Sequence, residues 1–326
     1  MIAYTLRRLF GAIPVVFIGI TITFLIIHLA PGDPTLCFLT PTMSAGSQEI
    51  IIERFGLNNP IYVQYFKWLY RIISHFDFGN SFNSGRPASD IIFDALPSTL
   101  LLTGLSLIFG LIFGTLLGIL SAIYKGTSID RFLTTIMLFF YSMPAFWIGL
   151  MLLSLFAIKL NLLPASQLIS VFHDQLSIVA RIFDYAKHLI LPVLTLGLAI
   201  SATFYRYART SMIESLNSDY ITAAKARGIK RRKVIFTYGL RNALIPLISL
   251  LGLSIPLLFS GAVIIEVIFS LPGMGRVMVN AVLSRDYPII LAASTLAFIS
   301  VTIGNMLADI AYAVADPRIR FKENYN

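Results

Sequence analysis

The chain has 326 residues, of which 57% are hydrophobic and only 13% are charged, and its formal net charge is +9. Soluble globular proteins carry about 25% charged residues, so this composition, with a mean hydropathy of +0.81, excludes an ordinary soluble domain. The single cysteine, Cys37, cannot form an internal disulfide.

A helix needs roughly 20 apolar residues to cross the hydrocarbon core of a bilayer. Six runs without Asp, Glu, Lys or Arg meet or approach this length: residues 9–30, 97–124, 132–158, 189–205, 243–265 and 289–308. The first run is longer than the apolar region of a secretory signal and no good cleavage site follows it, so it predicts a retained membrane helix. We therefore expect an all-α membrane protein with six transmembrane helices.

The distribution of basic residues predicts the orientation of these helices, because cytoplasmic loops of membrane proteins are enriched in Lys and Arg. If the N-terminus is cytoplasmic, the inside segments hold 16 of the 25 Lys and Arg residues. Both termini are therefore expected in the cytoplasm. The expected organisation is a first transmembrane helix (1–30), an extracytoplasmic segment (31–96) and a core of five helices (97–326) that includes a cytoplasmic loop at 206–246.

The segment at 31–96 begins with Pro31-Gly32-Asp33-Pro34, which ends the first helix. After Pro60, apolar residues recur at spacings of three and four and predict one apolar helix face, formed by Ile61, Tyr65, Trp68, Leu69 and Ile72. Two compatible interpretations remain open. The helix either forms a small core over the outer mouth of the protein or offers a docking surface to an extracytoplasmic partner.

Glycine and proline mark three of the expected spans. Gly110, Gly114 and Gly118 repeat every four residues on one face of the second span, which predicts close packing of another helix. Pro144 predicts a kink in the third span. The fifth span predicts an irregular backbone, because it contains four helix breakers: Pro246, Gly252, Pro256 and Gly261.

Several kinds of catalytic chemistry have no signature in the chain. There is no GxxxxGK[ST] phosphate loop, no HExxH and no GxSxG, and the four histidines are scattered. We expect no enzyme active site, no metal site and no cofactor in this chain. Asp77-Phe78-Gly79 spells a kinase magnesium motif, but the other kinase motifs are missing and the segment lies in an expected outside loop.

The loop at 206–246 interrupts the apolar pattern with nine basic and two acidic residues. Asn217, Ser218 and Asp219 are good N-cap residues, and Gly228 is a good residue just beyond a helix C-terminus. Together they predict a short cytoplasmic helix over residues 220–227. Such a helix, with Ala223 and Ala224 at its centre, fits a groove in another protein.

The order Ala223-Ala224-x-x-x-Gly228 resembles the EAA loop of ABC importer permeases, with Thr222 in place of the usual glutamate. The surrounding DYITAAKARG and LRNALIP resemble the dipeptide/oligopeptide/nickel group of these permeases. Further matches to that group occur in the same order along the chain: YTLRRL near the N-terminus, Pro31-Gly32-Asp33-Pro34, Asp77-Phe78-Gly79-x-Ser81, Met143-Pro144-x-Phe146-Trp147, Glu266-x-x-Phe269-Ser-x-Pro272-Gly273-x-Gly275, RDYP at 285–288 and ADPR at 315–318.

This resemblance implies a type I ABC importer permease in a prokaryotic cytoplasmic (inner) membrane. The implied partners are a second, homologous permease, two cytoplasmic ATPases that would carry ATP and magnesium, and an extracytoplasmic solute-binding protein. The resemblance places the ATPase-coupling helix at residues 219–228, with the candidate residues Asp219, Tyr220, Thr222, Ala223, Ala224, Arg227 and Gly228. It places an outer gate at Glu266, Phe269, Pro272, Gly273 and Gly275.

The implied substrate is a di- or oligopeptide, with nickel, glutathione or antimicrobial peptides as alternatives within the same group. Two other classes of protein are rivals. An ion-coupled secondary carrier is disfavoured because charged residues are nearly missing from the expected spans. A membrane scaffold whose basic loop binds anionic lipid would depend on the charge of the loop and not on the order of its small residues.

Overall fold

The computed structural model describes residues 2–29, 59–260 and 262–315. The turn expected at Pro31–Pro34, Cys37, Gly261 and the ADPR tail beyond Ala315 lie outside these ranges. Within them the chain is helical apart from turns and one isolated β-bridge between Asn80 and Pro87. The all-α fold class is confirmed.

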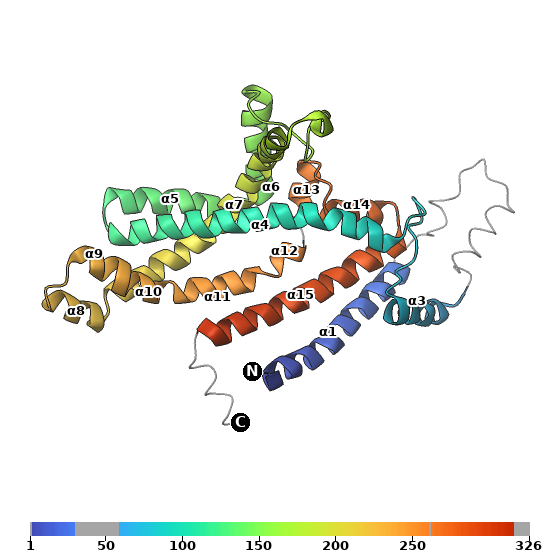
Figure 1. Cartoon of the computed structure of the whole chain (residues 1–326), viewed down its shortest axis with the longest axis horizontal. Helices are drawn as coiled ribbons and strands as arrows, with labels where there is room; N and C mark the ends of the chain where they lie inside the picture. The colour runs from blue at the N-terminus through green and yellow to red at the C-terminus, as the bar shows by residue number, and fades with distance from the viewer. Residues whose placement is uncertain (1, 30–58, 261, 316–326) are drawn as a thin grey trace.

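The elements follow one another along the chain as Figure 1 shows. They are α1 (Ile2–Leu29), α3 (Ile61–His75), α4 (Ala88–Ile123), α5 (Ser128–Ser142), α6 (Ala145–Leu152), the π-helix η2 (Leu153–Lys159), the short η3 (His173–Gln175), α7 (Ile178–Leu216), α8 (Asp219–Ala226), α9 (Arg231–Lys233), the π-helix η4 (Val234–Gly239), α10 (Leu240–Ala243), α11 (Ile245–Ser254), α12 (Leu257–Ser260), α13 (Val263–Ile268), α14 (Met274–Leu283) and α15 (Tyr287–Ala315).

Within the described residues, four helical stretches are long and apolar enough to cross a bilayer: Ala88–Ile123, Ile178–Leu216, Arg231–Ser254 and Tyr287–Leu307. A fifth forms if the bent pair Ser128–Ser142 and Ala145–Lys159 is one span. The first expected span coincides with α1, whose apolar stretch Ile13–Leu29 is shorter than these. The count of six transmembrane helices stays a prediction.

Parallel packing of α4 on α7 forms the main seam of the bundle, and the glycines of α4 explain it. A Cβ atom on Gly110 would lie 2.7 Å from Ile200 Cβ, and one on Gly118 would lie 2.6 Å from the carbonyl oxygen of Tyr205. Gly114 is pressed against the carbonyl oxygen of Ser201 in the same way. The predicted role of these glycines in helix packing is confirmed.

α1 and α15 form a second, antiparallel pair. The rings of His28 and Tyr287 lie 5.3 Å apart near one end of the pair. Further along, a Cβ on Gly19 would lie 2.9 Å from the ring of Phe298. Figure 1 shows α3 and α8 at opposite ends of the molecule, and these ends are called the α3 end and the α8 end below.

The helix expected after Pro60 is α3, and Pro60 is its N-cap residue. Trp68 and Ile72 are buried in a core shared with α1, the start of α4 and the start of α15. The predicted small core is thus present at the α3 end. The extracytoplasmic placement of the segment stays a prediction.

Three expected elements differ from the observed ones. Pro144 produces more than a kink, because it separates α5 from α6 with a bend of 104° between the two halves of the span. The fourth expected span, 189–205, is only the middle of α7, which runs unbroken for 39 residues from Ile178. α4 begins at Ala88, so the boundary expected at residue 97 falls inside this helix, which contains Pro97.

The fifth expected span is broken, as its prolines and glycines predicted. Residues 243–265 are divided among α10, α11, α12 and α13. Pro246 lies in the first turn of α11, and Pro256 lies between α11 and α12. The stretch at 269–275 leads into α14, a short apolar helix that precedes α15.

Candidate functional site

The short helix expected in the basic loop is α8, and it occupies Asp219–Ala226, one residue earlier than predicted. Ser218 is the N-cap residue, but its hydroxyl donates to Ser215 O at 2.6 Å and does not cap the helix. Gly228 has a φ of +72° just beyond the C-terminus, as predicted. Its N–H donates to Lys225 O, and the N–H of Ile229 donates to Ala224 O, which completes a Schellman motif.

The paired alanines of α8 differ in burial. Ala224 is buried with Ile221 and Val234 in a small core that fixes α8 to η4. Ala223 and Thr222 are exposed on the other side of the helix. Because residues three and four apart share a helix face, Asp219, Thr222, Ala223 and Ala226 form one exposed surface of mostly small side chains, which we call the α8 face.

Polar contacts hold α8 against the end of α7. The hydroxyls of Tyr220 and Ser215 lie 2.6 Å apart, and Ser215 also donates to Gly239 O at 2.9 Å. Burial alone would raise the pKa of the Tyr220 phenol, but hydrogen bonds with Ser215, Ser218 and Asn242 lower it below its usual value. Tyr220 therefore helps to hold α8 against α7 through its hydroxyl, although its side chain is 41% exposed.

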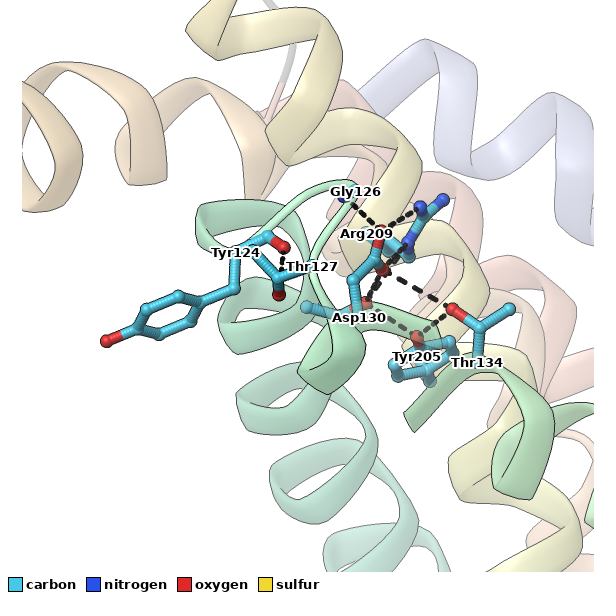
Figure 2. Close-up of polar contacts among 8 residues, drawn as sticks. Tyr124, Gly126, Thr127, Asp130, Thr134, Tyr205 and Arg209 are labelled. Carbon is cyan, nitrogen blue, oxygen red and sulfur yellow. Dashed lines mark hydrogen bonds and ion pairs between the residues drawn. The ribbon is translucent and has the colours of Figure 1, made fainter. Parts of the chain in front are cut away.

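A buried ion pair lies at the same end of the molecule, between α5 and α7. Arg209 donates from Nε to Asp130 Oδ1 at 2.8 Å and from Nη2 to Asp130 Oδ2 at 2.9 Å, a two-point contact of the kind that fixes geometry. The N–H of Gly126 and the hydroxyl of Ser121 also donate to this carboxylate. Figure 2 shows the carboxylate of Asp130 directed toward Gly126 and Arg209.

The hydroxyl of Tyr205 extends the network, since it lies 2.7 Å from Ser121 Oγ and 2.8 Å from Thr134 Oγ1 (Figure 2). We call Ser121, Asp130, Thr134, Tyr205 and Arg209 the α8-end clasp. It joins the last turn of α4, the first turns of α5 and the part of α7 that leads into α8. Arg209 is one of the nine basic residues of the loop, and its ion pair with Asp130 was not indicated by the sequence.

The expected gate residues gather around Glu266, whose side chain is fully buried. Thr99 Oγ1 donates to Glu266 Oε1 at 2.8 Å, and the N–H of Arg276 donates to Oε2 at 3.1 Å. Gly273 is the N-cap residue of α14, so the carboxylate caps the positive end of this helix. Thr99 also accepts from the N–H of Met274 at 2.8 Å.

Glycine is required beside this carboxylate. A Cβ on Gly273 would overlap the carboxyl group of Glu266, and one on Gly275 would lie 2.6 Å from Val263 Cα. Phe269 is buried in a core with Leu102 and Leu191, on α4 and α7. Pro272 lies between Leu271 and Gly273 in the link from α13 to α14. These five expected residues therefore form one structural unit at the α3 end, which we call the Glu266 cluster.

Two motifs far apart in the sequence meet at the same end. Ser81 Oγ donates to Asp286 Oδ2 at 2.6 Å, and the N–H of Phe82 donates to Asp286 Oδ1 at 3.0 Å. Asp77 accepts only from the nearby N–H of Gly79, at 2.8 Å, among its described contacts. The contact between DFGxS and RDYP was missed, because nothing in the spacing of the motifs indicates which of them pair.

Two of the scattered histidines also meet. His173 Nδ1 lies 2.7 Å from Asp184 Oδ2, and His188 Nδ1 lies 3.4 Å from Asp184 Oδ1. In the described part of the chain, no group of three or more His, Cys, Asp or Glu residues could hold a metal ion. The cluster joins the loop before α7 to α7 itself.

The structure combines a bundle of apolar helices with a short helix at one end and a broken helix with a buried carboxylate at the other. This arrangement fits a membrane transport subunit. The chain belongs to the binding-protein-dependent transport system inner membrane component family, whose model matches residues 114–321. The model of the N-terminal part of these components matches residues 1–103. The expected membership among ABC importer permeases is confirmed.

Two relatives match along their entire length. The chain is 41% identical to the oligopeptide transport system permease protein AppB of Bacillus subtilis over 98% of its own length and 100% of that protein. It is 35% identical to the glutathione transport system permease protein GsiC of Escherichia coli (strain K12) over 99% of its own length and 100% of that protein. The resemblance to the dipeptide/oligopeptide/nickel group is thereby confirmed.

Proposed function

We propose that this chain is one of two permease subunits of an ATP-driven importer for di- or oligopeptides, and that α8 docks on its ATPase. The observation that carries the docking role is the α8 face. It presents small side chains outward on a helix that the Schellman motif, the Ala224 core and the Tyr220–Ser215 contact hold to the bundle. A rigidly held helix transmits displacement, whereas a loosely held one absorbs it.

The peptide substrate is supported by the two relatives, one named for oligopeptide transport and the other for glutathione, itself a small peptide. Family membership supports a solute-binding protein as a partner. A second permease and two ATPases, with ATP and magnesium on the ATPases, complete the proposed complex. The chain has no phosphate loop, so hydrolysis belongs to the partners.

The docking role is tested by bulky substitution on the α8 face. Ala223→Trp should block recovery of the ATPase with the purified membrane complex, because the indole fills the space that a partner surface requires. Ala186→Trp is the matched control, since Ala186 is also exposed but lies near the other end of α7. Equal recovery of the ATPase with both variants would contradict the proposal.

The same experiment separates the lipid-binding scaffold from the importer. Ala223→Trp leaves every charge of the loop in place, so a scaffold that binds anionic lipid would bind it unchanged. Loss of ATP-driven peptide uptake with normal membrane insertion would support the importer. Uptake that persists without any ATPase and follows an ion gradient would support the secondary carrier.

We also infer that both termini and α8 are cytoplasmic. The exposed basic residues of the loop gather around α8 and support this orientation: Lys225, Arg227, Lys230, Arg231, Arg232, Lys233 and Arg241. A reporter that is active only in the cytoplasm should be active when fused after residue 326 and inactive when inserted after Gly85, at the α3 end. The reverse pattern would overturn the inference.

A further inference from the structure

α3 has an apolar surface that the rest of the described chain covers only in part. Its covered side rests on α1: the hydroxyl of Tyr65 lies 2.7 Å from Thr21 Oγ1, and the rings of Phe24 and Trp68 lie 5.4 Å apart. This contact accounts for the sequence pattern that predicted the helix. It does not account for the apolar residues on the neighbouring face.

Four large apolar side chains of α3 point away from this contact. Tyr62, Phe66, Tyr70 and Ile73 are 66%, 65%, 68% and 74% exposed. Their spacing of four, four and three residues aligns them in one stripe along the helix. We call these four residues the α3 stripe.

The charged residues of α3 lie on its remaining side. Lys67, Arg71, Ser74 and His75 are exposed. At 100° per residue they occupy an arc next to the stripe, and Lys67 and Ser74 are the members nearest to it. An exposed apolar face with Tyr and Phe, next to a face with Lys and Arg, is the pattern of helices that lie in the plane of a membrane surface.

The depth of α3 along α1 agrees with this pattern. Thr21 lies eight residues before Leu29, the last residue of α1, so Tyr65 contacts α1 about 12 Å from its end. Over this same length α1 exposes Ile22, Leu25, Ile26 and Leu29. The α3 stripe therefore lies at the same level as the exposed apolar surface of α1, which is expected to cross the membrane.

We propose that α3 is a membrane-surface helix, which inserts the α3 stripe into the leaflet opposite to α8 and directs Lys67 and Arg71 toward lipid phosphates. Lipid matches both the apolar face and the basic face of α3. Aromatic side chains favour the boundary between hydrocarbon and headgroups, and the adjacent cations match the phosphates. If the stripe faced water, three aromatic side chains and Ile73 would be exposed together without apolar contact.

Spin labels test the proposal in the assembled importer, reconstituted in nanodiscs of zwitterionic and anionic phospholipid. Cys37 is replaced by serine, and single cysteines are introduced as Phe66→Cys, Tyr70→Cys and, as a control on the polar side of the same helix, Ser74→Cys. The collision rate of each spin label is measured with oxygen, which concentrates in lipid, and with chromium oxalate, which stays in water. The two rates together show whether the label lies in lipid or in water. All three positions are exposed, so the substitutions should not disturb folding.

The expected result is a ratio of oxygen to chromium oxalate collision that is several-fold higher at Phe66→Cys and Tyr70→Cys than at Ser74→Cys. Two results would overturn the proposal. Equal, high collision with chromium oxalate at all three positions would place the stripe in water. Protection of the two stripe labels from both reagents would show that a protein surface covers it. Neither outcome depends on whether α8 docks on an ATPase.

Discussion

Asp130 accepts hydrogen bonds from Ser121, Gly126, Thr134 and Arg209 at the α8 end. Together with Tyr205 it links α4, α5 and α7. A buried carboxylate that loses its guanidinium partner is left with an uncompensated charge. Arg209 remains partly exposed, so water offsets some of this cost. The clasp is therefore expected to stabilise the bundle by a moderate amount.

We predict that Asp130→Asn and Arg209→Met each lower the free energy of unfolding by about 2 kcal/mol. The double variant should lose less than the sum of the two, because the second substitution removes a group that has already lost its partner. Thermal unfolding in detergent measures all three. Strict additivity would show that the two side chains do not depend on each other.

Around Glu266 the two glycines allow a sharper comparison. Gly273→Ala should destabilise the protein by about 2 kcal/mol through overpacking. Glu266→Ala has its own cost, because Thr99 and the N–H of Arg276 lose their acceptor. The Glu266→Ala, Gly273→Ala double variant should nevertheless lose less than the sum of the two, because the new methyl group meets only Glu266 among the three nearest atoms. With Gly275→Ala the effects should be closer to additive, because that methyl group also meets the backbone of Val263. Thermal unfolding of the single and double variants checks this, and the same departure from additivity for both glycines would contradict it.

At the scale of elements, some features of α8 can be predicted from the sequence and others cannot. Its existence and its end at Gly228 follow from local chemistry, because a left-handed residue beyond a helix is best supplied by glycine. The different roles of Ala223 and Ala224 do not follow, since the inward side of α8 is decided by Val234, ten residues further on. The same limit hid the contact of Ser81 with Asp286, which are 205 residues apart.

The breaks at Pro144 and in 243–265 were predictable because proline acts locally, through its missing N–H and its ring. The size of the bend between α5 and α6 was not, because it depends on what each half packs against. The long α7 was hidden for a related reason. Its first turns carry polar residues such as Asp184 and His188, which interrupt the apolar pattern yet satisfy each other once folded.

Gly228 provides the prediction for α8 as an element. A Cβ at this position meets no atom within 4 Å, so Gly228→Ala should cost about 1 kcal/mol through the left-handed backbone alone. Asn tolerates this conformation better, so Gly228→Asn should cost less. Faster hydrogen exchange at the amide of Ile229, which donates to Ala224 O, measures the loss. Unchanged exchange in Gly228→Ala would show that the motif contributes nothing to holding α8.

At the scale of the whole molecule, the seam between α4 and α7 connects the two candidate sites. Thr99, which donates to Glu266, and Ser121 of the α8-end clasp both lie on α4. Phe269 packs against Leu191 of α7, and Arg209 lies on the same helix. A displacement of α8 can therefore reach the Glu266 cluster as the movement of one tightly packed helix pair.

This connection predicts that loosening the seam harms transport more than it harms assembly. Gly114→Ala places a methyl group against the carbonyl oxygen of Ser201 and the Cβ of Phe204, and forcing the helices apart should cost about 2 kcal/mol. Gly104→Ala, on the same helix with no atom within 4 Å of the new Cβ, should be neutral or stabilising by up to about 1 kcal/mol. In the reconstituted importer, Gly114→Ala should keep its ATPase partner but transport less peptide per ATP hydrolysed, while Gly104→Ala should match the unmodified chain. If both variants transported equally well per ATP, the seam would be a packing contact without a part in coupling.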